Sequence, residues 1–193
     1  MSAMFEGDAY NPVVFLLGSN SGDRKDFLLR ACDMLEKEIY FSALIEQRWA
    51  RSVPFDMGIH VSRPRVWKSS IREYPAWPEG SDLQPFLNMA LVLLSDKSPQ
   101  ELLTIAKNTE QNLGRDLTLP LYDEHGERIY RPRTIDIDII FYGGLIYRSE
   151  DLVIPHPLYR ERRFVLEPIA EAVPEYIDPV TGKSVRQLLN ELK

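Results

Sequence analysis

The sequence predicts an α+β sandwich in which an antiparallel sheet carries two long helices on one face. Short apolar runs are typical of buried strands, and segments with helical apolar spacing lie between them. Their order is β, α, β, β, α, β, followed by further helices. A chain of 193 residues can bury roughly 70% of its unfolded surface, so one domain over residues 1–193 is expected.

The N-terminal part of the chain predicts a strand, a tight loop and a helix. The apolar run VVFLL at 13–17 is ended by Gly-Ser-Asn at 18–20, and apolar residues recur at helical spacing over 27–35. A further strand is predicted at 45–52, although two arginines interrupt it. The run FLNMALVLL at 86–94 suits a central strand, but a buried helical turn has the same pattern.

The clearest helix signal begins at Ser98. This serine is a good N-cap, proline follows at the first helical position, and Glu101 completes a capping box. Gly114 can adopt the left-handed conformation that ends a helix. Residues 115–130 then predict a long loop of the kind that often carries function. The remaining predicted elements are a strand at 135–142, a turn at 143–144, a return strand at 145–147 and helices near 158–171 and 184–192.

Composition and charge indicate a globular protein of the cytoplasm. The formal net charge of -6 argues against a general nucleic-acid binder. The single cysteine, Cys32, lies among apolar helical positions, which favours a buried inert thiol over a nucleophile. The first 20 residues have no basic n-region and only a five-residue apolar run. We therefore expect a cytoplasmic monomer with small-molecule partners and neither nucleic-acid nor membrane partners.

Two aspartates lie within the predicted strand of RPRTIDIDIIFYGG at 131–144. Asp136 and Asp138 point to the same face of a strand, with Cα atoms about 6.6 Å apart, while Ile135, Ile137 and Ile139 point to the other face. Carboxylates this close repel one another and need a cation between them. That cation is either Mg²⁺, which prefers oxygen ligands, or a lysine or arginine on an exposed strand face.

Arginines near this pair favour Mg-nucleotide chemistry, because the guanidinium group binds phosphate oxygens in a bidentate manner. They are Arg115, Arg131, Arg133, Arg160, Arg162 and Arg163. The sequence has no Walker A loop, kinase glycine loop, G-x-S-x-G elbow or zinc-binding spacing. Phosphate chemistry is therefore predicted without a common nucleotide-binding motif.

The motifs together resemble those of the 6-hydroxymethyl-7,8-dihydropterin pyrophosphokinases of folate biosynthesis. The resemblance rests on LGSNSGDR, FLNMALVL, the E-x-x-LGR helix end, PRTIDIDII and IPHPLYRERRFVLEPIAEAVPE, which span most of the chain. It implies a ferredoxin-like antiparallel sheet with helices on one face plus C-terminal helices. It also implies transfer of the β,γ-diphosphate of ATP to the pterin hydroxymethyl group, with release of AMP. Two Mg²⁺ ions bound by Asp136 and Asp138 would assist.

The resemblance also implies roles for eight further residues. Phe86, Phe164, Asn88 and Tyr130 correspond to pterin-binding positions, and Arg115, Arg133, His156 and Arg162 to positions that hold the triphosphate of ATP. Arg115 and Arg133 are the implied catalytic residues. A flat heterocycle with a polar edge needs two apolar faces and an in-plane donor and acceptor, which Asn88 can supply. Taken alone, each phenylalanine is better explained by core packing, and only the matched family context favours pterin binding.

Several positions depart from the family pattern. Arg131 replaces a small residue before Pro-Arg, and Ile129 stands where a charged residue is usual. A loop insertion is expected at about 56–84, and its basic stretch at 58–72 is interpreted either as a lid over Mg-ATP or as a flap that extends the sheet edge. These departures leave open a catalytically silent pterin- or nucleotide-binding module. A different Mg-dependent transferase on the same fold is a third possibility.

Overall fold

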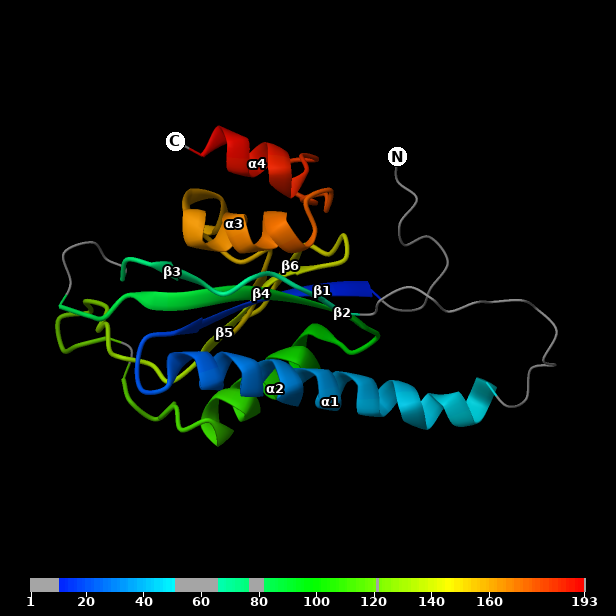
Figure 1. Cartoon of the computed structure of the whole chain (residues 1–193), viewed down its shortest axis with the longest axis horizontal. Coiled ribbons are helices and arrows are strands. Elements are labelled where there is room, and N and C mark those ends of the chain that lie inside the picture. Colours follow the sequence, from blue (N-terminus) through cyan, green and yellow to red (C-terminus); the bar gives the residue numbers. More distant parts are fainter. Residues whose placement is uncertain (1–10, 51–65, 77–81, 121, 193) are drawn as a thin grey trace.

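The computed structural model describes residues 11–50, 66–76, 82–120 and 122–192, with the backbone alone for 40–50. Its centre is an antiparallel five-stranded sheet with the order β2-β4-β1-β5, in which β3 also pairs with β4 (Figure 1). The strands are β1 (Asn11–Ser19), β2 (Val66–Lys68), β3 (Arg72–Tyr74), β4 (Phe86–Ser95) and β5 (Asp136–Tyr142). The run at 86–94 is therefore a strand and not a helical turn.

Helices cover both faces of the sheet (Figure 1). On one face lie α1 (Arg24–Ala50) and α2 (Pro99–Asn112), and on the other lie α3 (Arg163–Ala172) and α4 (Val185–Glu191). This arrangement confirms the predicted α+β class, with the two long helices on one face and the C-terminal helices added. Among the described residues, no helix combines the length and apolar character that crossing a membrane requires.

Strand periodicity divides the buried side chains into two cores. Phe15, Leu17 and Ile137 belong to the core under α1 and α2, whereas Leu16 and Ile140 belong to the core under α3 and α4. Cys32 lies in the first core, where burial raises its pKa to about 12, so the predicted inert thiol agrees with the structure. Each isoleucine that flanks the aspartates faces the α1 and α2 core, as the alternation predicts.

The ends of α2 follow the predicted signals. Ser98 forms a capping box with Glu101, which satisfies backbone N–H groups at the start of the helix. Gly114 has a φ of 84°, a left-handed conformation that glycine adopts without steric cost. Arg115 follows directly, so the end of α2 sets the position of this arginine.

The strand predicted at 45–52 is wrong for its described part, because α1 continues as a helix to Ala50. The sequence ALIEQRWA at 43–50 consists mostly of good helix formers and contains neither proline nor glycine. The next strands in the chain are β2 and β3, within the segment predicted as a loop at about 56–84. Whether that segment is an insertion stays a prediction.

Two elements near the C-terminus also differ from expectation. The return strand predicted at 145–147 is β6 (Tyr147–Arg148), which pairs with β7 (Val153–Ile154) and not with β5. The helix predicted at 158–171 begins only at Arg163, after a 3-10 turn at Tyr159–Glu161. The later helix start follows Pro155 and Pro157, whose rings restrict the backbone just before it.

Candidate active site

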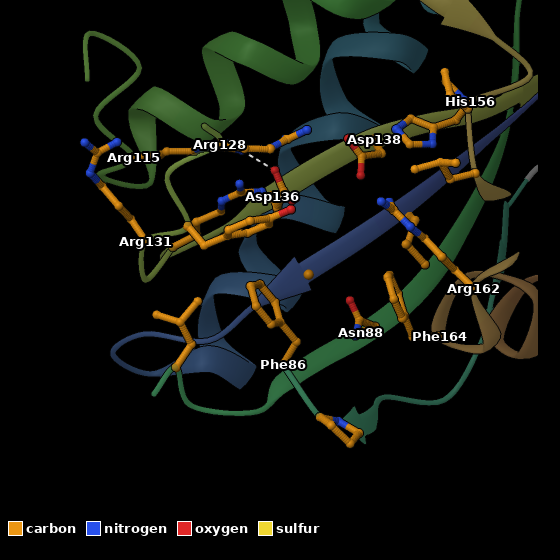
Figure 2. Close-up of a pocket in the computed structure, with 18 of the residues that line it drawn as sticks. Phe86, Asn88, Arg115, Arg128, Arg131, Asp136, Asp138, His156, Arg162 and Phe164 are labelled. Atoms are coloured by element: carbon orange, nitrogen blue, oxygen red, sulfur yellow. Dashed lines mark hydrogen bonds and ion pairs between the residues drawn. The ribbon is translucent and has the colours of Figure 1, made fainter. Parts of the chain in front are cut away.

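A pocket with a volume of about 360 Å³ lies at the end of the sheet where β1 finishes and β4 and β5 begin. Its floor is formed by side chains on the sheet face that α3 and α4 cover, at the point where these helices no longer reach. Its walls come from the loop before β5, the 156–158 loop and the N-terminus of α3 (Figure 2). The volume is in the range typical of small-molecule sites.

All ten predicted site residues line this one pocket. They are Phe86, Asn88, Arg115, Tyr130, Arg133, Asp136, Asp138, His156, Arg162 and Phe164. The strands bring together residues that are up to 78 positions apart (86 to 164). Their proximity is a property of the structure, whereas the ligand that each residue binds stays a prediction.

Asp136 is the most strongly paired residue of the pocket. One of its oxygens accepts from Arg115 and the other from Arg133, and its side chain is 21% exposed. Burial acts to raise the pKa of Asp136, but the guanidinium groups of Arg133 and Arg115 outweigh it and hold this pKa below its usual range. Asp136 is therefore a carboxylate already surrounded by positive charge.

Asp138 differs from Asp136, although both point to the same face of β5 (Figure 2). In the part of the chain that the structure describes, Asp138 forms no hydrogen bond and no ion pair. Burial and then the neighbouring charge of Asp136 raise the pKa of Asp138, against the opposing influence of His156 and Lys107. The predicted repulsion between the two carboxylates is thus concentrated on Asp138.

An apolar slot forms the other end of the pocket. Figure 2 shows Asn88 between Phe86 and Phe164, and we call these three residues the aromatic slot. Asn88 is 4% exposed, and its side-chain amide has no hydrogen-bond partner within the described residues. A Cβ atom on Gly18 would lie 2.7 Å from the Asn88 Oδ1 atom, so only glycine leaves the amide this room. The slot can take a flat ring and bond its edge.

Three further predicted residues surround the opening between the slot and the aspartates. The Arg162 guanidinium lies over the Phe164 ring, 5.7 Å from its centre. His156 has a buried Nδ1 atom without a hydrogen-bond partner among the described residues, and its backbone N–H donates to the Ile140 carbonyl. Tyr130 is 38% exposed and lies under the Arg128 guanidinium. An anion entering here would meet donors from three separate segments.

The family model of 7,8-dihydro-6-hydroxymethylpterin-pyrophosphokinase matches residues 14–174, a range that contains every residue of the pocket. The chain belongs to this family. The match confirms the resemblance drawn from the motifs, and it places the chain among the pyrophosphokinases.

Relatives of this chain differ in length. The 2-amino-4-hydroxy-6-hydroxymethyldihydropteridine pyrophosphokinase of Methylorubrum extorquens is 34% identical over 176 residues, which cover 91% of this chain and 90% of the relative. The protein of the same name from Synechocystis is 36% identical over 135 residues, which cover 70% of this chain and 62% of the relative. The folic acid synthesis protein FOL1 of Dictyostelium discoideum is 34% identical, but the chain spans only 21% of it.

Solved structures support the fold of this chain. The wild-type HPPK-DHPS protein of Plasmodium falciparum with pteroate superposes with a TM-score of 0.59 at 14% sequence identity. The superposition covers 94% of this chain and 44% of that one. At this identity the likeness concerns the fold alone.

Sequence analysis assigned no binding role to three charged residues that line the pocket. Lys107 lines it from α2, and Arg128 lines it from the loop before β5. Arg131, predicted as one of the arginines near the aspartates but given no role in binding, also lines the pocket and donates to the Pro120 carbonyl. Lys107 could have been found from its position one turn before Glu110 of the E-x-x-LGR motif, whereas Arg128 lies in a loop without a periodic signal.

Asn20 connects the segments that carry the site residues. Its Oδ1 atom accepts from the Arg133 N–H at 2.7 Å, and its Nδ2 atom donates to the Gln84 carbonyl at 3.2 Å. Its own backbone N–H donates to the Arg133 carbonyl at 3.1 Å. This buried amide therefore fixes the end of β1 against the residues that precede both β4 and β5.

Proposed function

We propose that this protein transfers the β,γ-diphosphate of ATP to the hydroxymethyl group of 6-hydroxymethyl-7,8-dihydropterin, releasing AMP, as a step of folate biosynthesis. Membership of the pyrophosphokinase family supports this proposal. The observation that carries it is that one pocket joins the aromatic slot to a carboxylate pair surrounded by arginines. The aromatic slot suits a flat acceptor, and the carboxylate pair with its arginines suits a polyphosphate donor.

The aromatic slot is the proposed pterin site. Phe86 and Phe164 offer the two apolar faces, and the amide of Asn88 offers one donor and one acceptor to the edge of the ring. Because the amide lines the pocket and bonds none of the described residues, a ligand that covers and bonds it would satisfy a polar group that an apolar ligand would leave buried at a cost. This match favours a heterocycle over a purely apolar ligand.

We call Asp136, Asp138, Arg115 and Arg133 the charged end, and it is the proposed site of the ATP phosphates. The described residues contain no group of three or more His, Cys, Asp or Glu side chains that could enclose a metal. Two carboxylates fit Mg²⁺ nevertheless, because this ion is commonly bound by one or two carboxylates together with substrate phosphates. The unpaired Asp138 carboxylate fits such a ligand. When bound, Mg²⁺ would neutralise charge on the transferred group.

The residues of the chain contribute mainly position and charge. Arg115 and Arg133 project toward the same carboxylate, so their remaining N–H groups can reach phosphate oxygens nearby. His156 and Arg162 approach from the opposite wall and would hold the outer phosphates. Holding the acceptor in the slot and the donor at the charged end brings the hydroxymethyl oxygen in line with the β-phosphorus.

Nucleotide products distinguish the three hypotheses. The purified protein is incubated with ATP and Mg²⁺, with and without the reduced pterin, and nucleotides are separated by chromatography. AMP that appears only with the pterin is the expected result. Absence of AMP under both conditions would favour the silent binding module, and ATP turnover with another acceptor would favour a different transferase. The monomeric state and cytoplasmic location stay predictions for light scattering and cell fractionation.

A further inference from the structure

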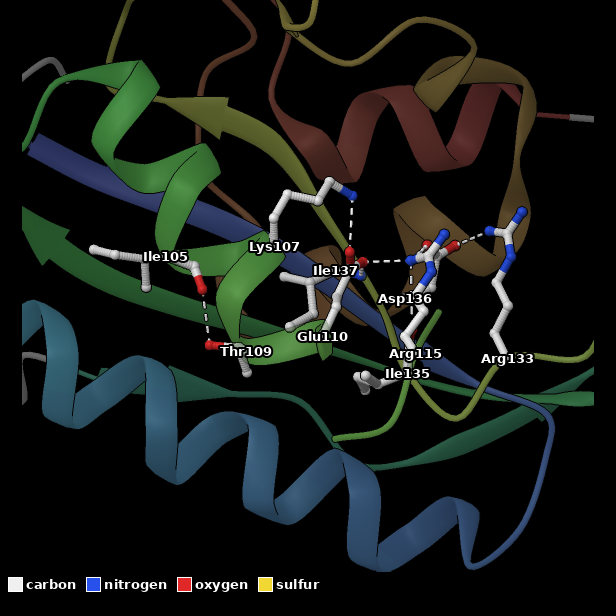
Figure 3. Close-up of polar contacts among 9 residues, drawn as sticks. All are labelled: Ile105, Lys107, Thr109, Glu110, Arg115, Arg133, Ile135, Asp136 and Ile137. Atoms are coloured by element: carbon white, nitrogen blue, oxygen red, sulfur yellow. Dashed lines mark hydrogen bonds and ion pairs between the residues drawn. The ribbon is translucent and has the colours of Figure 1, made fainter. Parts of the chain in front are cut away.

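Glu110 lies in the last turn of α2, outside the pocket lining, and is 0% exposed. Its Oε2 atom accepts from the Lys107 ammonium at 2.8 Å. Its Oε1 atom accepts from the Ile137 backbone N–H at 2.8 Å and from the Arg115 guanidinium (Figure 3). A carboxylate is rarely buried to this extent, and here donors from α2, from the loop that follows it and from β5 satisfy it.

The bond to Ile137 concerns the backbone between the two aspartates. β5 is last in the described strand order, with β1 on one side. The Ile137 N–H points to the other side, toward α2, where the Glu110 carboxylate accepts it as a neighbouring strand would. Because a buried backbone donor needs a partner, Glu110 fixes the peptide that sets the relative position of Asp136 and Asp138.

The bond to Arg115 concerns the charged end directly. One nitrogen of Arg115 contacts both Glu110 and Asp136. On the proposed function, Asp136 turns to the cation that accompanies ATP, and its contact with Arg115 weakens. Glu110 is then the carboxylate that still holds the guanidinium at the pocket wall. Lys107, which also lines the pocket, is held by the second oxygen of the same side chain.

We propose that Glu110 is a positioning residue, which aligns Arg115 and the Asp136–Asp138 backbone for diphosphate transfer without touching a substrate itself. This inference rests on the proposed function. The simpler alternative is a buried ion pair that matters only for folding, since breaking such a pair is strongly destabilising. The two interpretations differ in whether turnover changes in a protein that remains folded.

The test uses Glu110→Gln in the full chain, since glutamine can still accept from the Ile137 N–H but loses the negative charge that holds Arg115. Circular dichroism and the melting temperature establish that the variant is folded. We expect kcat to fall about 10- to 100-fold, the range of a lost hydrogen bond to a charged group. The Kd for the pterin should stay within about twofold, because the aromatic slot does not contact Glu110. Glu101→Gln on the exposed start of α2 is the matched control and should leave both values unchanged.

A double-mutant cycle tests whether Glu110 acts through Arg115. In an Arg115→Ala background, Glu110→Gln should lower kcat by less than about twofold, because the group that it positions is absent. Independent, multiplying effects would overturn the proposal, and so would a folded Glu110→Gln variant with normal kcat and a lowered melting temperature.

Two further results distinguish a failure of the positioning role from a failure of the proposed function. If Glu110→Gln does not fold, Glu110→Asp keeps the charge but shortens the reach, and a kcat within about twofold of wild type would then overturn the proposal. A wild-type protein that releases no AMP overturns the proposed function and the positioning role together. An active wild type with an undisturbed Glu110 variant overturns the positioning role alone.

Discussion

At the charged end of the pocket the side chains contact one another, whereas in the aromatic slot they are held separately and face the cavity. Arg115 and Arg133 both bond Asp136, and Glu110 holds Arg115 from behind. In the slot, the Asn88 amide bonds none of the described residues. A ligand entering the charged end must therefore replace existing ion pairs, while a ligand entering the slot can bond the Asn88 amide without replacing a hydrogen bond to any described residue.

This difference has a physical reason. Like charges left unpaired in a low-dielectric pocket are costly, so the charged end needs internal counter-ions before ATP binds. Aromatic faces and a single amide cost less, because packing and backbone register can hold them in place. We expect substitutions at the charged end to change turnover and stability, and substitutions in the slot to change mainly pterin affinity.

The largest expected effect is on turnover at the carboxylate pair. Asp136→Asn and Asp138→Asn should each lower kcat/KM by about 1,000-fold, since a metal clamp supplies several kcal/mol of charge stabilisation and 1.36 kcal/mol corresponds to tenfold in rate. The rate of AMP release at saturating Mg²⁺ measures kcat/KM for each variant. Asp33→Asn, an exposed aspartate on α1, is the control. Near-normal turnover in either pocket variant would rule out the metal assignment.

In the slot, Phe164→Ala should raise the Kd for the pterin by about tenfold or more. The loss combines stacking worth about 0.5–1.5 kcal/mol with the lost burial of the ring. Calorimetry with the pterin measures it, and binding of a non-hydrolysable ATP analogue alone should barely change. The Kd of Phe164→Leu for the pterin should lie between those of the wild type and Phe164→Ala, because leucine keeps an apolar side chain. Equal losses for both ligands would indicate a folding defect and would remove the distinction between the two ends.

The two aspartates should also affect the stability of the metal-free protein with opposite signs. The pKa of Asp138 is raised on folding, so its proton is bound more tightly in the folded state. Stability is then lost as the pH rises from the unfolded pKa through the folded one. The pKa of Asp136 is lowered, so its contribution is present above the unfolded pKa and is lost as the pH falls through the folded one.

At neutral pH in EDTA, Asp138→Asn should therefore raise the melting temperature and Asp136→Asn should lower it. A free-energy change of 1 kcal/mol corresponds to about 2–4 °C in a domain of this size. Scanning calorimetry measures both variants, and addition of Mg²⁺ should stabilise the wild type more than either of them. A rise of equal size in both variants would mean that repulsion dominates at both carboxylates and that the arginine contacts of Asp136 contribute little.

Local signals account for what the sequence predicted well. The two-residue period of a strand places Asp136 and Asp138 on one face, and the capping box at Ser98 with Gly114 sets both ends of α2. The family motifs then named ten residues, which the structure brings into one pocket. Each of these inferences needs only residues close in sequence or a known pattern.

The features that could not be predicted depend on contacts between distant residues. Glu110 meets the Ile137 N–H across 27 positions, and nothing in the E-x-x-LGR motif shows that its carboxylate completes a strand edge. β2 and β3 are three residues long and exist as strands because β4 is there to pair with them. The predicted strand at 45–52 failed because a few apolar residues fit either period.

The described part of the predicted insertion forms ion pairs with helices on both faces of the sheet. Lys68 pairs with Glu36 on α1, and Arg72 pairs with Glu171 on α3. Arg63 and Arg65, the other cations of the proposed lid, lie outside the described residues. The described part of this segment is thus engaged at the sheet edge, and it lines the pocket through Pro75, directly after β3, and Leu83.

The smallest expected effect tests whether β3 supports the aromatic slot. The Tyr74 ring lies 6.4 Å from the Phe164 ring between centroids, and its hydroxyl donates to the Glu167 Oε2 atom of α3 at 2.9 Å. Tyr74→Phe keeps the ring contact and removes the hydrogen bond, which is typically worth about 0.5–1.5 kcal/mol net. Without this hydrogen bond the Tyr74 ring is held less firmly, and the Phe164 ring that it contacts should become more mobile. We therefore expect the Kd for the pterin to rise about two- to threefold, with kcat unchanged. Tyr147→Phe is the matched control, because it removes a 2.8 Å bond to Gln100 on an exposed surface away from the pocket. If both variants lower the melting temperature equally and neither changes the Kd, β3 stabilises the fold without supporting the slot, and the slot depends on β4 and α3 alone.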